Sequence, residues 1–229
     1  MQGILLVDKP AGWTSFDVVN YVRKIIAAYE GKKPKNTKVG HTGTLDPFAT
    51  GLLILLIGKE YTRKAGELSK ADKSYEVTMR LGQVSTTGDT EGEITDADGS
   101  QPSTEELETV LQKFTGEIEQ IPPAYSAIRV NGQRAYKLAR AGKEVIIESR
   151  KITVHKLRLA SYIYPEAQLV TSVSSGTYIR TIVEDIGKAL GTGAYTYSLR
   201  RTRVGSFDIT HALSVDDLTP AQIEKSLLH

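Results

Sequence analysis

The sequence predicts an α+β protein with a mixed, mostly antiparallel central sheet flanked by helices. Short runs with the two-residue period of strands and longer stretches with a helical period follow one another without strict β-α-β alternation. Two strand-like segments, Ile152 to Leu159 and Ala167 to Val173, are close enough in sequence to pair as antiparallel neighbours. No linker rich in glycine, serine or proline divides the 229 residues, so we expect one domain over 1–229.

The first half of the chain should contain three strands and two helices. The strands are expected at Ile4 to Val7, Leu52 to Ile57 and Ser74 to Leu81. The run from Leu52 is apolar throughout and lies between glycines, which is typical of a strand buried on both faces. Thr14 or Ser15 should cap a helix with an apolar stripe, and the capping box from Ser103 to Glu106 should open another.

The second half should continue with strands and shorter helices. A loop is expected over Asp89 to Gly99, before the Ser103 helix. After that helix we expect a strand at Ser126 to Val130 with a turn at Asn131-Gly132, and then a basic helix at Ala135 to Ala141. A helix over Thr177 to Leu190 ended by Gly191, a strand at Tyr195 to Leu199 and a final helix after Thr219-Pro220 should complete the chain.

The composition excludes several classes of protein. Hydrophobic residues make up 40% of the chain and charged residues 24%, as in ordinary globular proteins. No apolar run reaches the roughly 18 residues of a membrane span. The chain has no cysteine, its four histidines have no metal-ligand spacing, and it lacks the glycine-rich loops that bind nucleotides. We therefore expect a cytoplasmic protein without a metal, a nucleotide cofactor or a membrane partner.

Charge is sorted into regions although the net charge is only +2. Residues 126–158 hold nine lysines and arginines against two glutamates, and residues 21–38 hold six against one. A third basic cluster contains Arg200, Arg201 and Arg203, whereas residues 86–108 hold eight acids and no base. One charged run is usually just a solvated face, but several basic runs together favour nucleic acid as the partner.

One carboxylate, Asp46, lies between Gly43 and Gly51, directly before the predicted buried strand. A loop that enters the core at this point would make a carboxylate costly unless a cation pairs with it. Pro47 restricts the backbone of Asp46 to extended conformations and so orients its side chain. From the local pattern alone, an Asp-Pro pair in a glycine-rich loop is more often an ordinary turn.

The string from Gly40 to Gly51, GHTGTLDPFATG, closely resembles the signature loop of the tRNA pseudouridine synthase B family. Three further segments resemble motifs of that family in the same order along the chain. They are Asp72-Lys73-Ser74-Tyr75, Ser175-Gly176-Thr177-Tyr178-Ile179-Arg180-Thr181 and Leu199-Arg200-Arg201-Thr202-Arg203-Val204-Gly205. The resemblance extends from about Ile4 to Asp208, and four motifs in order are more specific than any one of them.

The resemblance implies a pseudouridine synthase fold and a set of site residues. By this resemblance Asp46, Tyr75 and Arg180 are expected to be catalytic, with Arg180 paired to Asp46 and Tyr75 lying against the target base. His41, Tyr178 and Leu199 are implied to bind the substrate at the pocket. Chemistry agrees, because a guanidinium is a permanent cation that favours an ionised carboxylate beside it. Without the motifs, the tyrosines and the leucine would be ordinary core residues and Arg180 a solvent or phosphate contact.

Pro122-Pro123-Ala124-Tyr125-Ser126-Ala127 and the basic stretch after it resemble the family's RNA-clasping insertion, which we place at about 124 to 151. We expect RNA contacts from its basic residues and from the third basic cluster, namely Arg129, Arg134, Lys137, Arg140, Arg200 and Arg201. Many members of the resembled family continue into a small C-terminal RNA-binding domain of the PUA type. The roughly twenty residues after Asp208 are too few for one, so we expect no PUA domain here, either because this lineage lacks it or because the chain is truncated.

The resemblance implies an isomerase that converts the T-loop uridine of tRNA, position 55, to pseudouridine by base flipping. No cofactor is expected, the partner is the tRNA T-arm, and the protein should be a monomer. An RNA-binding folding helper for tRNA, with catalysis secondary, is the alternative, and a guide-RNA-dependent relative is a third possibility. The carboxylate Asp46 favours the enzyme, because binding a polyanion does not need one.

Overall fold

The protein is described by a computed structural model covering residues 1–126, 128–130 and 132–229. It contains two compact units, which are described separately: unit 1 is Met1–Tyr75 with Leu199–His229, and unit 2 is Glu76–Ser198. The chain passes from one unit to the other within two strands, β4 (Lys73–Leu81) and β12 (Ala194–Val204). Since both passages lie inside strands, no linker marks them, which explains why the sequence predicts one domain.

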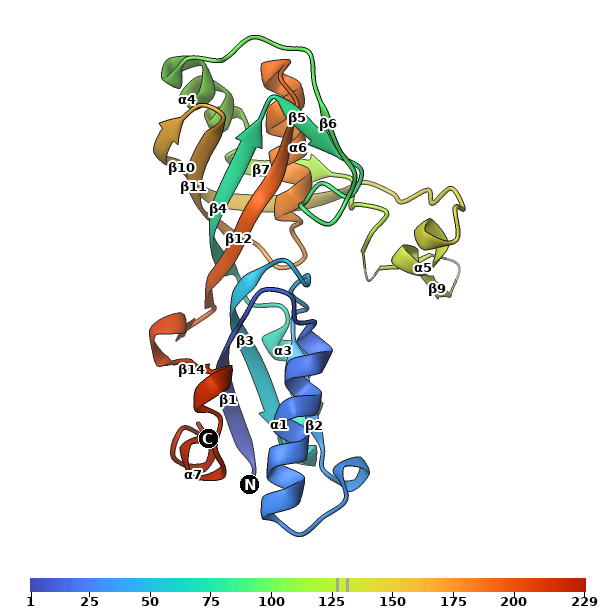
Figure 1. Ribbon diagram of the computed structural model, residues 1–229, viewed down its shortest axis with the longest axis vertical. Coiled ribbons are helices and arrows are strands. Elements are labelled where there is room, and N and C mark those ends of the chain that lie inside the picture. The colour runs from blue at the N-terminus through green and yellow to red at the C-terminus, as the bar shows by residue number, and fades with distance from the viewer. Residues whose placement is uncertain (127, 131) are drawn as a thin grey trace. The chain divides into compact units, whose positions relative to one another are not determined.

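Ten strands are hydrogen-bonded in a mixed, mostly antiparallel sheet, which confirms the predicted α+β class. In unit 1 the order is β14-β1-β3-β12, and in unit 2 it is β12-β4-β11-β10-β7 (Figure 1). β1 with β14 and β3 with β12 are parallel pairs, whereas the other pairs with a described register are antiparallel.

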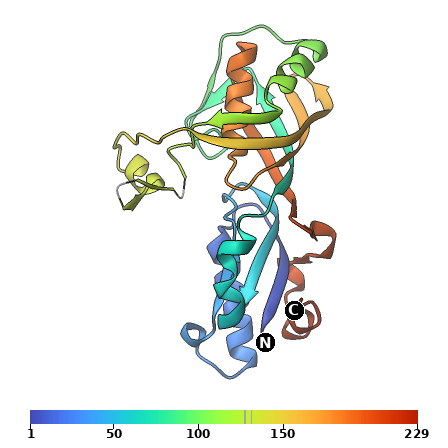
Figure 2. The ribbon, with the colours of Figure 1, turned by 180° about the vertical axis from the view of Figure 1, so that it is seen from behind.

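Unit 1 buries its central strands between helices on both faces. α1 (Ser15–Tyr29), opened by a capping box of Thr14 and Asp17, packs its valine and isoleucine stripe on Leu5, Val7 and Leu53. The opposite face of β3 (Thr50–Ile57) meets α2 (Lys59–Arg63) and α3 (Ala65–Leu68), as the view from behind shows (Figure 2). The remaining elements of unit 1 are β1 (Gly3–Lys9), η1 (Pro34–Asn36), β2 (Val39–Thr42), β13 (Phe207–Asp208), η2 (Ile209–His211), β14 (Leu213–Ser214), η3 (Val215–Asp217) and α7 (Pro220–Lys225).

Unit 2 is built on a long antiparallel hairpin of β10 (Arg150–Ile163) and β11 (Glu166–Val173). α4 (Thr104–Lys113) and α6 (Ile179–Leu190) contact one another, and α4 also contacts β10 (Figure 2). The other elements are β5 (Gln83–Ser85), β6 (Ile94–Asp96), β7 (Gly116–Gln120), β8 (Arg129–Val130), β9 (Gln133–Arg134) and α5 (Ala135–Arg140). Among the described residues, β8 and β9 pair with each other in a separate two-stranded sheet, which lies with α5 apart from the ten-stranded one.

Most predicted elements are present, but several bounds differ, and β2, β5, β7, α2 and α3 were not predicted. Of the strand expected over Ser126 to Val130, β8 covers Arg129–Val130. The stretch expected to be an acidic loop contains β6, which pairs with β5 through its backbone, although its side chains are exposed and show no apolar pattern. The last long strand continues to Val204, and α6 begins at Ile179 because Tyr178 is still extended. Asn131 of the expected turn lies outside the described residues. No helix in the described ranges is long and apolar enough to cross a membrane.

Candidate active site

The loop that carries Asp46 connects β2 to β3 in unit 1, and its main chain is held by buried groups. Ser15, 2% exposed at the start of α1, bonds both main-chain groups of Leu45: the Leu45 amide donates to its hydroxyl at 2.8 Å, and the hydroxyl lies 3.1 Å from the Leu45 carbonyl. The residue before Asp46 is therefore fixed to a helix terminus, with its buried polar groups paired. Asp46 itself is partly exposed.

The residue after Asp46 is fixed as well. The carbonyl of Pro47 accepts from the Gly12 amide at 2.8 Å and from the ammonium of Lys9 at 3.2 Å. Lys9 is fully buried, and its ammonium also donates to the carbonyls of Pro10 and Trp13. Asp46 thus lies between two neighbours whose main chains are anchored, which restricts the position of its own main chain.

Cationic side chains lie close to the beginning of this loop. Arg201, 1% exposed, donates from Nη2 to the Gly43 carbonyl at 3.0 Å, and a Cβ on Gly43 would lie 3.6 Å from Cε of Lys73. Burial lowers the pKa of His41 and the Arg201 cation lowers it further. Burial also lowers the pKa of Lys73 to about 8, with Arg201 adding to the effect and Asp72 opposing it.

The lowered pKa of Lys73 predicts a specific pH dependence of stability. Below about pH 8 Lys73 is charged in the folded and unfolded chain, so the cost of burying the cation is present in full. Above that pH the folded chain releases the proton while the unfolded chain, with a pKa near 10.5, retains it. Between about pH 8 and about pH 10.5, the free energy of unfolding of the wild type should therefore rise relative to that of Lys73→Met, by at most about 3 kcal/mol.

Urea unfolding of both proteins at several pH values between about 7 and about 10 measures this difference. Lys70→Met, which removes an exposed lysine nearby, is the matched control and should show no such trend. A wild-type to Lys73→Met difference that stays constant across this range would contradict the assignment.

Tyr75 and Leu199 are both nearly buried in unit 1, at 7% exposure each. Tyr75 lies on the same face of β4 as Lys73, since alternate residues of the strand are buried. The structure therefore places these two predicted pocket residues, with Asp46 and His41, in unit 1. Their contact with a base remains a prediction.

Arg180 and Tyr178 belong to unit 2, where Arg180 is held in a buried network. Its guanidinium forms an ion pair with Asp89 at 3.1 Å, and the side chains are 4% and 3% exposed. It also donates to the carbonyls of Thr87 at 2.7 Å and Tyr125 at 2.9 Å. Asp89 accepts in turn from the hydroxyl of Thr87 and the amide of Glu91. The predicted pairing of Arg180 with Asp46 joins residues of different units and stays a prediction.

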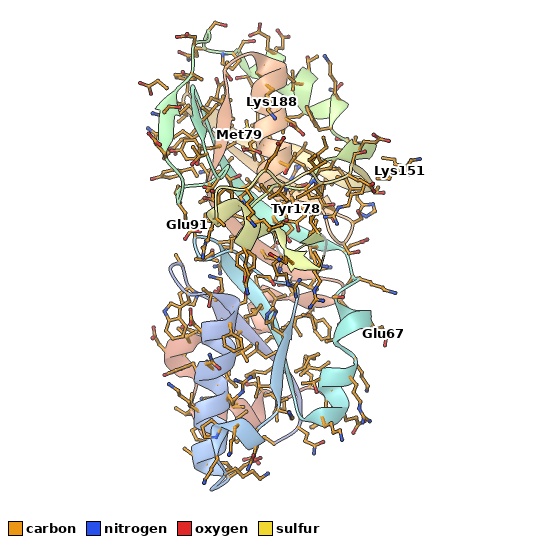
Figure 3. The ribbon with its side chains drawn as sticks, turned by 90° about the vertical axis from the view of Figure 1, so that its right-hand side faces the viewer. Glu67, Met79, Glu91, Lys151, Tyr178 and Lys188 are labelled. Carbon is orange, nitrogen blue, oxygen red and sulfur yellow. The ribbon has the colours of Figure 1, made fainter. Side chains whose placement is uncertain are left out.

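Tyr178 is fixed at the N-terminal end of α6, where Figure 3 labels it. The amide side chain of Gln120 bonds both its main-chain groups, accepting from the amide at 2.8 Å and donating to the carbonyl at 3.0 Å. The guanidinium of Arg150 lies over the tyrosine ring at 5.2 Å and donates to the Gly176 carbonyl. The backbone of the motif around Tyr178 is thus tied to β7 and β10.

The residues expected to contact RNA have different surroundings. The side chains of Arg129, Arg134, Lys137 and Arg140, in β8, β9 and α5, are exposed. Arg200 is partly exposed and pairs with Asp8 at 2.6 Å. Arg201 is buried and bonded to main-chain carbonyls, which counts against the expected RNA contact, because an exposed phosphate would not reach it.

Sequence reasoning did not identify Lys9 or Asp89 as structural supports. It named Ser15 only as a helix cap and Arg201 only as an RNA contact, and so missed the bonds that both make to the Asp46 loop. Ser15 was visible as a possible helix cap, but its partner Leu45 is distant in sequence. Asp89 is one of eight acids in its stretch, and nothing local distinguishes it from the solvated ones. Only its ion pair with the buried guanidinium of Arg180 distinguishes Asp89 from those acids.

Comparison with known proteins identifies the class. Residues 31–179 match the family described as TruB family pseudouridylate synthase (N terminal domain), and residues 180–229 match the tRNA pseudouridylate synthase B C-terminal domain. The chain also resembles a solved Cbf5-Nop10-Gar1 complex (TM-score 0.72, 29% identity, 94% of this chain and 53% of that one). A Nop10-Cbf5 complex gives 0.69 at 26% identity, covering 98% and 57%. The fold is that of the pseudouridine synthases, which are isomerases.

Two curated relatives narrow this class to a family. The tRNA pseudouridine synthase B of Burkholderia lata is 44% identical over 96% of this chain and 66% of its own length. That of Pseudomonas aeruginosa is 44% identical over 98% of this chain and 71% of its own length. The chain belongs to the TruB family of pseudouridylate synthases. It spans about two thirds of the length of these relatives.

Proposed function

We propose that this chain converts the T-loop uridine at position 55 of tRNA to pseudouridine. The observation that carries the proposal is the anchored Asp46 loop, in which Leu45 and Pro47 are bonded to buried groups on either side of the carboxylate. The relatives at 44% identity are named tRNA pseudouridine synthase B, which supports a tRNA pseudouridine synthase activity. A loop fixed in this way suits a group that must meet a reacting atom in one geometry.

The reaction moves one bond and needs no redox step. The N1–C1′ glycosidic bond breaks, the uracil turns, and a C5–C1′ bond forms while the C5 proton leaves and N1 gains one. Asp46 would act as the nucleophile, at C1′ of the sugar or at C6 of the base, or would support a glycal route. All three routes need an ionised carboxylate, and the proposal does not depend on the choice among them.

Arg180 and Tyr75 complete the proposed catalytic set. Arg180 supplies a permanent cation that would support the charge of Asp46, and its two carbonyl bonds and its ion pair with Asp89 support a fixed orientation. Tyr75 would lie against the flipped uracil, with Leu199, Tyr178 and His41 as further substrate contacts. The aromatic ring of Tyr75 suits stacking against a base.

The exposed basic side chains of β8, β9 and α5 would contact phosphates of the T-arm. Such contacts would offset the few kcal/mol needed to unstack the uridine, and tRNA affinity should fall steeply with salt concentration. The proposal is for one catalytic domain that acts as a monomer on tRNA in the cytoplasm. A guide-RNA-dependent activity is less well supported, because the Cbf5 structures are less similar in sequence than the tRNA enzymes.

The proposal is tested by site-specific turnover. Two tRNA transcripts would be incubated with the chain alone, one unmodified and one with cytidine at position 55. Pseudouridine is expected at position 55 of the first and nowhere in the second. Binding of both transcripts without pseudouridine in either would instead favour the folding helper, whereas pseudouridine at other positions would contradict the assigned substrate.

A further inference from the structure

Arg201 and Arg180 are the buried arginines among the described residues, and they differ in what they bond. Arg180 pairs with Asp89, Arg200 with Asp8 and Arg203 with Asp208. Within the described part of the chain, no carboxylate pairs with Arg201, which is nonetheless 1% exposed. A buried cation without an ion pair is costly unless its donors are satisfied, so its hydrogen bonds indicate its role.

Those bonds connect the two ends of the Asp46 loop. The Nε of Arg201 donates to the Leu52 carbonyl at 2.8 Å, after the loop, and its Nη2 donates to the Gly43 carbonyl at 3.0 Å, before it. The main chains also meet here, because Arg201 of β12 is the parallel partner of Gly51 in β3. A Cβ on Gly51 would collide with the main chain of Arg201. One side chain therefore spans the base of the loop that presents Asp46.

We propose that Arg201 is a positioning residue for the isomerisation, which closes the base of the Asp46 loop and so sets the place of the carboxylate. The inference rests on the proposed function, because the positioned group is the one assigned there to catalysis. This positioning role differs from the RNA contact that the sequence predicts for Arg201.

A guanidinium is suited to this task in a way that an ammonium is not. Its N–H groups diverge in one plane, so the two carbonyls can be held at a fixed separation, whereas Lys has one compact donor on a flexible stem. The charge also acts on the base of the loop. Arg201 contributes to the lowered pKa of both His41 and Lys73. Arg201→Lys would retain the charge and lose the second bond.

The test compares Arg201→Lys and Arg201→Gln with the wild type in kcat, in KM and in the Kd for tRNA. A misplacement of about 1 Å at a reacting group can cost about 100-fold in rate. We therefore expect kcat of Arg201→Lys to fall by about 30- to 100-fold and that of Arg201→Gln by more. The Kd should stay within about twofold, because Arg201 does not meet the RNA. Arg63→Lys, an exposed arginine of α2, is the matched control and should leave all three values unchanged.

Two outcomes would overturn the proposal. Unchanged kcat with a lower melting temperature would mean that Arg201 only stabilises the fold. A weaker Kd with unchanged kcat, and a salt dependence of log K reduced by roughly one, would mean that Arg201 contacts a phosphate.

A second measurement keeps the proposal testable if activity is lost through unfolding. The single tryptophan, Trp13, lies in unit 1 beside Lys9, so its fluorescence reports whether that unit is folded. In folded Arg201→Lys, amide hydrogen exchange should be faster for residues 43–51 and unchanged in β10 and β11. Unchanged amide hydrogen exchange for residues 43–51 would refute the proposal that Arg201 closes the base of the loop. This result does not depend on the RNA substrate, whereas inactivity of the wild type on tRNA would refute the proposed function instead.

Discussion

Replacing Asp46 with asparagine is expected to abolish turnover while tRNA binding is retained. Asparagine has almost the same size, and the bonds from Ser15 and Lys9 that fix the loop go to the main chain of Leu45 and Pro47. The variant should therefore keep the loop but lose the ionised carboxylate. Removal of a catalytic nucleophile commonly costs at least about 10⁴-fold in kcat, and we expect a loss of that order here.

Single-turnover kinetics and filter binding on the same tRNA transcript separate the two effects. The Kd of Asp46→Asn should lie within about threefold of the wild type, since one charge facing the RNA changes little of a phosphate-dominated affinity. Asp217→Asn, an exposed aspartate of η3, is the control for a change of one charge in unit 1 and should be fully active. Turnover by Asp46→Asn near the wild-type rate would remove Asp46 from the mechanism.

Replacing Asp89 with asparagine is expected to cost both stability and activity. The change leaves the bonds from Thr87 and Glu91 possible but removes the charge that faces Arg180 in a region almost inaccessible to water. Leaving one partner of a buried ion pair without the other typically costs about 3–5 kcal/mol. Turnover should fall by roughly 100-fold, because Arg180 loses one of the contacts that orient it.

Chemical denaturation measures the first effect, and kcat measured on the fraction that remains folded measures the second. Asp98→Asn, an exposed residue of the same acidic stretch, is the matched control and should change neither value. A stable Asp89→Asn protein would show that the ion pair contributes little. Full activity in the folded variant would show that the pair is structural only.

The fold was predictable where local chemistry determines it. The capping box of Ser103 and Glu106 forms as expected, and so does the buried strand from Leu52. β6 was not predictable, because its backbone pairs with β5 while its side chains carry no apolar alternation. The division into two units was hidden for a similar reason: β4 and β12 are continuous strands that contribute residues to both.

The site divides in the same way. Asp46 and Arg180 stood out because motifs surround them, and the family is confirmed by the comparisons. The groups that hold them did not stand out. The carbonyls that Arg201 bonds are about 150 positions earlier in the chain, and a sequence pattern carries no information on such pairs. Arg201 looked like part of a basic surface because its neighbour Arg200 is partly exposed and Arg203 is exposed, whereas its own side chain is buried.

The central claim is that this chain alone isomerises the T-loop uridine through Asp46. The most direct test is carbodiimide labelling and primer extension on an unmodified tRNA transcript incubated with the wild-type chain, with Asp46→Asn beside it. The account predicts a stop at position 55 with the wild type and none with the variant. A stop of equal strength with both proteins, or no stop with the wild type despite measurable tRNA binding, would contradict it.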